Sequence, residues 1–188
     1  TPEKLSDTVC VVGIDVDDKI FRSDEAQKRV RNMLPTKVVI VPIVPIMYGH
    51  VCRIWSHLAS RAGQHDDFIV LLGDDIVLES EGWQEKIEIR FKEISDRSLL
   101  PYGAACVAMN DKSFPGFPTF PVVHRWHVDH FGRLLPKQFI NQGGDPYLYE
   151  LYSRWNASSF EMSCQLRNTL GGDSDARYSK YAINWPGQ

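Results

Sequence analysis

The sequence predicts an α/β fold in which a mainly parallel sheet is flanked by helices. Two observations support this prediction: short apolar runs alternate with segments of helical periodicity, and the central run, residues 68–72, is apolar on both faces. Strands that alternate with helices are typical of βαβ units, whose sheets are buried on both sides. The chain has 188 residues, 43% hydrophobic and 24% charged, and is expected to form one domain over residues 1–188.

Three strands and two helices are predicted in the first half of the chain. Ser23 is expected to cap a helix that ends near Met33, because a serine hydroxyl can accept a hydrogen bond from a first-turn amide. Pro42 is expected to end the second strand, because proline cannot donate to a strand ladder. The predicted elements are strands over residues 8–14, 37–41 and 68–72, and helices over 24–33 and 51–62.

The second half is expected to continue with shorter elements. Apolar spacing predicts a helix over residues 83–94. The segment 111–121 has too many prolines for a central strand and is expected to be a loop. Pro146 suits the first position of a helix that runs to about Trp155, which makes Asp145 its expected N-cap. The other predicted elements are a strand over 101–108 and a short strand that turns into a helix over 122–130.

Two adjacent carboxylates, Asp74 and Asp75, follow the central apolar run after Gly73. An unpaired carboxylate is very costly inside a sheet, so the strand is expected to end at Gly73 and to present both acids at its carboxyl edge. Open α/β sheets bind their ligands at that edge. A carboxylate pair there suits Mg²⁺ or Mn²⁺, which in turn bind phosphate, with Asp75 as the more direct ligand. The alternative interpretation is a solvated turn.

Three further sites with acidic or basic residues have both a functional and a structural interpretation. Asp15, Asp17 and Asp18 end the first strand, where a carboxylate could hold a base or ribose, or could form an Asx turn. Asp145 follows two glycines and could act as a general base, or could only cap its helix. Arg53 begins a helix and could meet a phosphate, or could be a solvated helix residue.

His124, His127 and His130 are not expected to form a zinc site. On a helix, each step of three residues turns the side chain by about 60°, so the three imidazoles fan out instead of converging. At least two of them are expected to be partly exposed polar residues without a ligand.

Composition excludes some partners. The net charge of −3 makes a nucleic-acid backbone an unexpected partner, and no apolar run is long enough to span a bilayer. The four cysteines are widely spaced and are expected to be buried free thiols, which favours the cytoplasm over the secretory lumen. The chain begins without Met or a signal peptide, so a trimmed or excised domain is expected.

Four short segments, in this order, resemble the GT-A class of nucleotide-sugar glycosyltransferases, which have a Rossmann-type sheet. Residues 11–18 resemble the base-binding strand end, 48–53 the helix whose basic residue faces the nucleotide, 71–76 the DxD metal motif, and 141–146 the segment that places the acidic base. The chain departs from the class at three points. Gly73 replaces the first acid of DxD, no histidine follows His130, and the first sheet strand is missing.

The resemblance implies metal-dependent transfer of a sugar from a UDP-sugar to the hydroxyl of a glycan, protein or small-molecule acceptor. It implies that Mn²⁺ or Mg²⁺ binds Asp75 with help from Asp74, that Asp15 or Asp17 holds the base, and that Arg53 steadies the nucleotide. It further implies that Asp145 is the base of an inverting reaction. The N-terminal half would bind the donor and the C-terminal half the acceptor. Two alternatives remain, a nucleotidyltransferase and a catalytically inactive nucleotide- or sugar-binding module.

Overall fold

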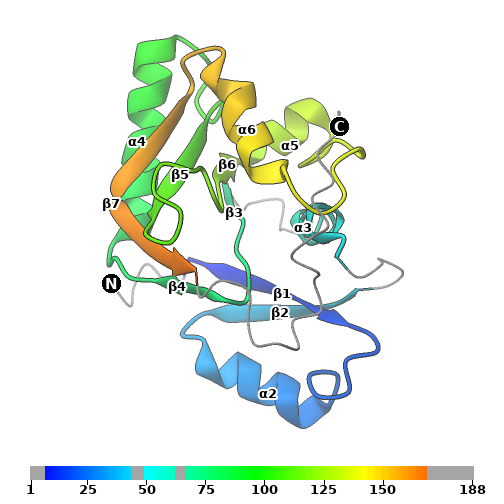
Figure 1. Ribbon diagram of the computed structural model, residues 1–188. Helices are drawn as coiled ribbons and strands as arrows, with labels where there is room; N and C mark the ends of the chain where they lie inside the picture. The colour runs from blue at the N-terminus through cyan, green and yellow to red at the C-terminus, as the bar shows by residue number, and fades with distance from the viewer. Residues whose placement is uncertain (1–6, 44–48, 62–66, 169–188) are drawn as a thin grey trace.

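The computed structural model describes residues 7–43, 49–61 and 67–168, which form a mixed α/β structure (Figure 1). Its strands are β1 (Val9–Asp15), β2 (Lys37–Ile43), β3 (Phe68–Val70), β4 (Ile76–Leu78), β5 (Cys106–Asp111), β6 (Val122–His124) and β7 (Ser158–Asn168). Its helices are α2 (Asp24–Met33), α3 (Val51–Ala59), α4 (Trp83–Ser98), α5 (Arg125–Phe131) and α6 (Gly144–Ser153). The predicted alternation of strands and helices is therefore present, with additional short strands.

The strands form two sheets. β1 and β2 pair in parallel, with Val9 opposite Lys37, as a sheet of 2 strands. The larger sheet has 5 strands in the order β3-β6-β5-β7-β4. In that sheet only β5 and β7 are parallel, and the other three pairings are antiparallel. The larger sheet is therefore mixed and not mainly parallel. The predicted short strand that precedes a helix is β6, but its antiparallel pairing with β3 and β5 was not expected, and β4 and β7 lie outside the predicted strands.

The core surrounds β5. Residues Cys106 to Met109 have no exposed surface, so both faces of this strand are covered. α4 contributes Ile87, Phe91 and Ile94 to the core, and α6 contributes Leu148 and Tyr152. Both helices contact β5 and β7, and they lie on opposite sides of the sheet (Figure 1). This arrangement holds the start of α6 at a fixed place beside the ends of the strands.

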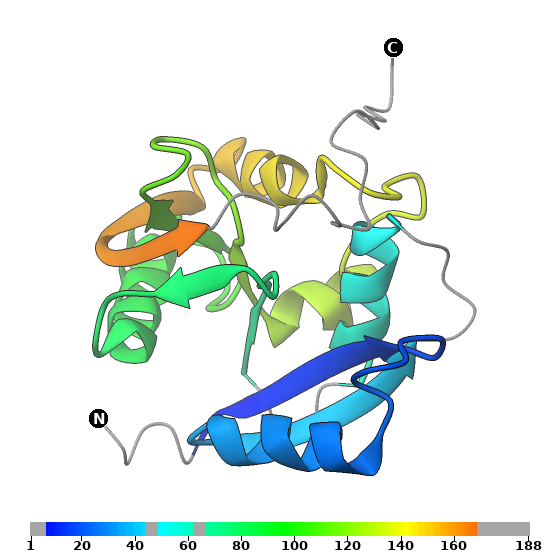
Figure 2. The same cartoon turned by 60° about the horizontal axis from the view of Figure 1, so that its bottom comes forward.

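The small sheet joins the larger unit through α3. Gly13 of β1 lies so close to α3 that an added Cβ would be 3.3 Å from Leu58 Cδ1. The first turn of α3 also contacts the segment before α6, because the amide of Cys52 donates to the carbonyl of Ile140 at 3.0 Å. α2 covers the outer face of the small sheet (Figure 2) and has no buried residue. Helix α3 is therefore the connection that sets the β1 edge relative to α6.

Several predicted boundaries are confirmed and others are wrong. The Ser23 hydroxyl accepts from the Ala26 amide at 3.3 Å, as expected of an N-cap. The second strand continues through Pro42 to Ile43, because among the described residues it pairs only with β1, and the missing proline amide can lie on the other edge. The fifth strand starts at Cys106 and extends to Asp111, five residues later than its predicted start at 101.

His127 is a structural residue and not a partly exposed one. It is 1% exposed, its Nε2 lies 2.8 Å from the carbonyl of Leu134, and its Nδ1 lies 2.8 Å from the hydroxyl of Tyr152. A carbonyl only accepts, so Nε2 carries the proton and Nδ1 accepts from Tyr152. Burial lowers the pKa of His127, which keeps the ring neutral. His124 caps α5 by accepting from the Trp126 amide, so the three histidines do not converge.

All four cysteines are free thiols, and Cys52, Cys106 and Cys164 are buried as predicted. Within the described parts of the chain, no helix has the length and apolar character needed to cross a membrane.

Candidate functional site

The carboxylates Asp74 and Asp75 form a turn between β3 and β4. The regular strand ends earlier than predicted, at Val70, and the chain continues extended, with Leu71 buried at 3% exposure and its amide bonded to the carbonyl of Pro121. β3 is an edge strand antiparallel to β6 and is not the centre of a parallel sheet. Both acids thus lie in a turn, which was the structural alternative, and not at the carboxyl edge of a parallel sheet.

Gly73 gives Asp75 room to fold back over the main chain. A Cβ added at Gly73 would lie 2.6 Å from Asp75 Oδ1 and 3.6 Å from Phe120 Cε1. The first of these distances is too short for any real contact, so a side chain at position 73 and the present position of the Asp75 carboxylate exclude each other. Glycine at position 73 thus has a local physical reason.

Trp55 fixes this turn to α3. Its indole N–H donates to the carbonyl of Leu72 at 3.2 Å, and its ring meets the ring of Phe120 edge-on, with centroids 6.3 Å apart. Edge-to-face contacts of this kind stabilise beyond the area they bury. The start of α3 and the acidic turn are therefore held together by one aromatic side chain.

Cys52 joins the same helix to the start of α6. Its thiol lies 3.2 Å from the carbonyl of Asn141, as donor, and a Cβ added at Gly144 would be 2.9 Å from its sulfur. Glycine at position 144 is thus needed for the close approach of the two helices. Burial, and then the charge of Asp145, raise the pKa of Cys52 to about 11, so the thiol remains neutral and adds no second charge.

Asp145 lies in the first turn of α6, but it is not the N-cap. Gly143, with φ of 84°, occupies that position, and α6 begins at Gly144. The Asp145 carboxylate instead accepts from the amide of Phe120, at 3.4 Å from Oδ2. The prediction of an N-cap was wrong by two residues, because glycine at positive φ begins the helix before the proline.

The environment of Asp145 raises its affinity for a proton. The carboxyl retains some exposed surface but is surrounded closely by protein atoms, and this burial raises its pKa to about 6, against the lowering effect of the Phe120 and Asp145 amides. A carboxyl whose pKa lies near neutral pH can take up and release a proton under working conditions. This property is the one expected of a general base, and helix capping does not require it.

Phe120 is held in place by a buried acid that sequence reasoning missed. Asp111, 1% exposed, accepts from Thr119 Oγ1 at 2.8 Å and from the Ser113 amide at 2.8 Å. Phe120 itself has φ of 48°, a conformation that non-glycine residues rarely adopt. The sequence signal was present, since Asp followed two residues later by Ser is typical of an Asx turn. Asp111 therefore fixes the loop end whose amide reaches Asp145.

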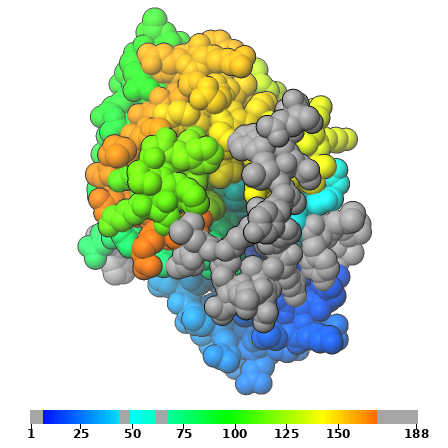
Figure 3. Space-filling view, viewed as in Figure 1, coloured from blue at the N-terminus to red at the C-terminus, as the bar shows by residue number. Residues whose placement is uncertain are grey.

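These contacts bring three of the four predicted segments together. The acidic turn, the start of α3 and the start of α6 meet around Phe120, and we call this region the candidate cleft. In the space-filling view the teal segment after β3 lies in a recess beside the bright-green β5–β6 loop (Figure 3). Asp74 is exposed at this turn and Asp75 is half-buried.

The remaining predicted residues lie at the edge of this region or outside it. Asp15 ends β1 and is half-buried, and Asp17 is exposed in the turn that follows. Asp18 accepts from the amides of Ile20 and Phe21, which is the Asx turn that was the structural alternative. Arg53 is exposed on the first turn of α3, and Tyr48, the first residue of its motif, lies outside the described residues.

The acidic turn offers two carboxylates, Asp74 and Asp75, as ligands for a divalent cation. In the parts of the chain that the structure describes, no three His, Cys, Asp or Glu side chains are grouped to hold a metal. Asp74 and Asp75 at an accessible turn fit a cation that takes few protein ligands, because Mg²⁺ keeps several waters and phosphate oxygens in its shell.

Replacing Gly73 by Ala is expected to displace the Asp75 carboxylate with little effect on folding. The clash is with the end of a side chain that can rotate away, so the free energy of unfolding should change by less than about 1 kcal/mol. If this turn holds a divalent cation, calorimetry should show that Mn²⁺ binds the variant at least about tenfold more weakly. Leu72→Ala, at the neighbouring exposed position, is the control, and unchanged Mn²⁺ affinity in Gly73→Ala would contradict this role.

Searches with this chain find no matching protein-family model, curated protein or solved structure.

Proposed function

We propose that this protein is a metal-dependent glycosyltransferase that moves a sugar from a UDP-sugar to an acceptor hydroxyl, with a GT-A-like Rossmann-type fold. One observation carries the proposal. Asp145, with its pKa raised to about 6, is connected through Phe120 to the turn that bears Asp74 and Asp75. In this proposal a proton acceptor and a carboxylate pair suited to a cation–diphosphate would serve one cleft beside Phe120.

In this proposal the residues divide the reaction between them. Asp145 accepts the proton of the acceptor hydroxyl as its oxygen forms a bond to the sugar's anomeric carbon. The bond from that carbon to the diphosphate breaks, and its electron pair leaves with UDP. Direct displacement of this kind inverts the anomeric configuration. Asp75 and Asp74 would hold Mn²⁺ or Mg²⁺, which would neutralise the negative charge of the leaving diphosphate.

The donor and acceptor would then occupy different halves of the chain. Asp15 or Asp17 would hold the base and Arg53 the nucleotide, at the edge of β1 and the start of α3. The acceptor, a glycan, protein or small molecule, would enter from the side of α6 and the β5–β6 loop. Cys52 and Trp55 support both halves from α3, so the relative position of donor and acceptor depends on this helix.

Calorimetric titration with UDP, with and without Mn²⁺, tests this proposal. We expect binding that requires Mn²⁺, because the diphosphate and the two carboxylates repel each other without a cation. Absence of UDP binding in both conditions would contradict the proposal. If UDP binds, screening UDP-sugars for hydrolysis and transfer separates an enzyme from an inactive binding module, and release of pyrophosphate from UTP with a sugar phosphate would indicate a nucleotidyltransferase instead.

A further inference from the structure

A series of hydrogen bonds runs from the end of β5 to the carboxylate of Asp145, through the end of the β5–β6 loop. The hydroxyl of Thr119 donates to Oδ2 of the buried Asp111 at 2.8 Å. The amide of the next residue, Phe120, donates to Oδ2 of Asp145 at 3.4 Å. Two carboxylates from different elements are therefore connected through two adjacent residues of the loop.

The Asp111 end of this series is fixed by the larger sheet. Asp111 is the last residue of β5, pairs with Leu166 of β7, and is 1% exposed. Its Oδ1 accepts from the amide of Ser113 at 2.8 Å. Ser113 donates its hydroxyl to the carbonyl of Asn168 at 2.8 Å and accepts from the Asn168 amide at 3.1 Å. Both ends of the loop are thus attached to the sheet around Asp111.

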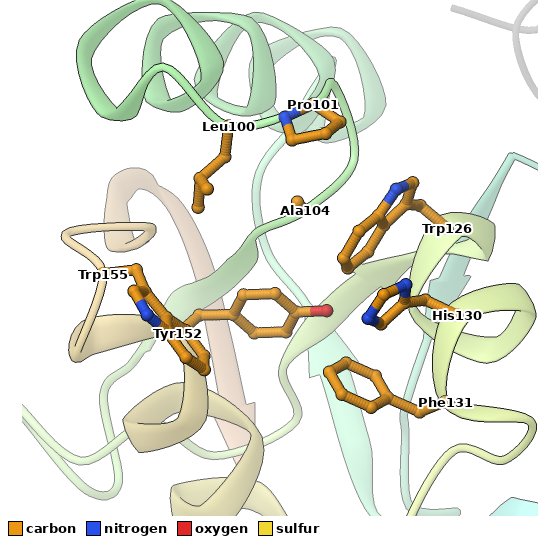
Figure 4. Close-up of a pocket in the computed structure, with 8 residues that line it drawn as sticks. All are labelled: Leu100, Pro101, Ala104, Trp126, His130, Phe131, Tyr152 and Trp155. Atoms are coloured by element: carbon orange, nitrogen blue, oxygen red, sulfur yellow. The ribbon is translucent and has the colours of Figure 1, made fainter.

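The helix that carries Asp145 is fixed independently of the loop. Tyr152, near the other end of α6, points toward His130 and Phe131 of α5 (Figure 4). Tyr152 is 2% exposed, and its hydroxyl lies 2.8 Å from Nδ1 of His127. Loss of the contact from the loop is therefore expected to change the surroundings of the Asp145 carboxylate and not the position of its helix.

Phe120 needs an anchor to keep its amide on Asp145. Its φ of 48° costs free energy in a residue with a side chain, and such a conformation persists only where the surrounding structure holds it. The preceding residue, Thr119, is 6% exposed and bonded to Asp111. Without that bond Phe120 can relax to negative φ, which reorients its amide.

We propose that Asp111 and Thr119 are positioning residues for Asp145, because they hold the amide of Phe120 on its carboxylate. The role rests on the proposed function, in which Asp145 is the base. A hydrogen bond to the ionised form of a carboxyl stabilises that form and orients the oxygen that accepts it. Burial raises the pKa of Asp145 to about 6, and the Phe120 amide acts against this effect.

Carbon-13 NMR of the Asp145 carboxyl, on the full chain without substrate, measures its titration midpoint between pH 4 and pH 9. Two other titratable groups face this carboxyl, the thiols of Cys52 on α3 and Cys106 on β5. Burial raises the pKa of both thiols, so neither changes its charge in this range. The amide signal of Phe120 in the wild type should shift with the same midpoint, because this amide donates to the titrating group.

Thr119→Val removes the hydroxyl and keeps the size of the side chain. We expect it to raise the Asp145 midpoint by about half to one pH unit. At pH 8, where the carboxylate is almost fully ionised in every variant, kcat should fall at least about tenfold with unchanged KM for the UDP-sugar. Thr119→Ser keeps the hydroxyl and should restore both values. Thr36→Val, which removes a hydroxyl bonded to the carbonyl of Thr8, is the matched control and should leave both unchanged.

The positioning role is overturned if Thr119→Val leaves the midpoint unchanged, or if Thr119→Ser or Thr36→Val raises it equally. If Thr119→Val does not fold, Thr119→Ala takes its place, since it puts no additional methyl group against Asp111. A Phe120 amide signal that does not titrate in the wild type would overturn the role without any variant. The titration needs no substrate, so absence of UDP binding would overturn the transferase, whereas an unchanged midpoint would overturn only the positioning role.

Discussion

Replacing Asp145 by Asn is expected to reduce sugar transfer by about 10²- to 10⁴-fold, the range for loss of a general base. The change removes the proton acceptor but preserves the shape of the side chain, and the Asn oxygen can still accept from the Phe120 amide that now bonds Asp145. Binding of UDP and Mn²⁺ should therefore remain near normal. Transfer rates and calorimetric UDP titration on the same preparations measure the two effects separately.

The pH dependence of transfer provides a second measure of this role. Because burial raises the pKa of Asp145 to about 6, the fraction of ionised base, and with it kcat/KM, should rise up to about pH 6 and then level off. Glu150→Gln, at an exposed position on the same helix, is the matched control and should keep the wild-type profile. Near-normal transfer by the Asn variant would remove Asp145 from the mechanism and the support for inversion with it.

Stability should change in the opposite direction to activity. The pKa of Asp145 is raised from 3.8 in its ordinary state to about 6 in the folded protein, so the folded state binds the proton more tightly than the unfolded state. The contribution of Asp145 to the free energy of unfolding is therefore fully present below about pH 4 and is lost as pH rises through 6. Above pH 7 the ionised carboxylate lowers the free energy of unfolding by up to about 3 kcal/mol, and by less where water still reaches it.

Asn at position 145 carries no titrating group, so the variant should unfold at a higher urea concentration than the wild type at pH 8 and at nearly the same concentration at pH 4.5. Urea denaturation at the two pH values measures this difference. A variant that is less stable at both pH values would show that the carboxylate holds α6 in place and that its charge does not destabilise the folded protein.

Much of the candidate site follows from local patterns. The apolar run before Asp74 and Asp75 ends in an acidic turn as predicted, because burying two adjacent carboxylates is too unfavourable for the strand to continue. Ser23 caps α2 because its hydroxyl acts on an amide three residues away. Such effects depend on neighbours in the sequence, and reading the sequence captures them.

What the sequence did not predict depends on partners far away along the chain. The mixed sheet requires β6 and β7 to pair with β5, and a three-residue strand such as Ile76–Leu78 has too few residues for a periodic signal. The raised pKa of Asp145 arises from the packing of α3 and the loop near Phe120 around it. Of the three histidines, His124 and His130 keep exposed surface as expected of at least two, and His127 is the buried one because it pairs with Tyr152, 25 positions away.

Replacing Asp75 by Asn is the second change with a large expected effect. A hard divalent cation binds carboxylate oxygens more strongly than amide oxygens, and here the protein supplies two carboxylates from one turn. Removing one of two negative charges beside a diphosphate should weaken Mn²⁺-dependent UDP binding by at least about 100-fold, or about 2.7 kcal/mol. Folding should be little affected, because the acid lies in a surface turn and not in the core.

Calorimetry of UDP in Mn²⁺, and electron paramagnetic resonance of the free Mn²⁺ that remains, measure this loss directly. Asp74→Asn should have a smaller effect, about tenfold, because Asp74 is exposed, whereas the Asp75 carboxylate is half-buried and folded back over Gly73. Asp129→Asn, at an exposed position on α5, controls for the change in net charge. Equal losses from Asp74→Asn and Asp129→Asn would indicate a general charge effect, whereas unchanged Mn²⁺ affinity in Asp75→Asn would contradict the metal site.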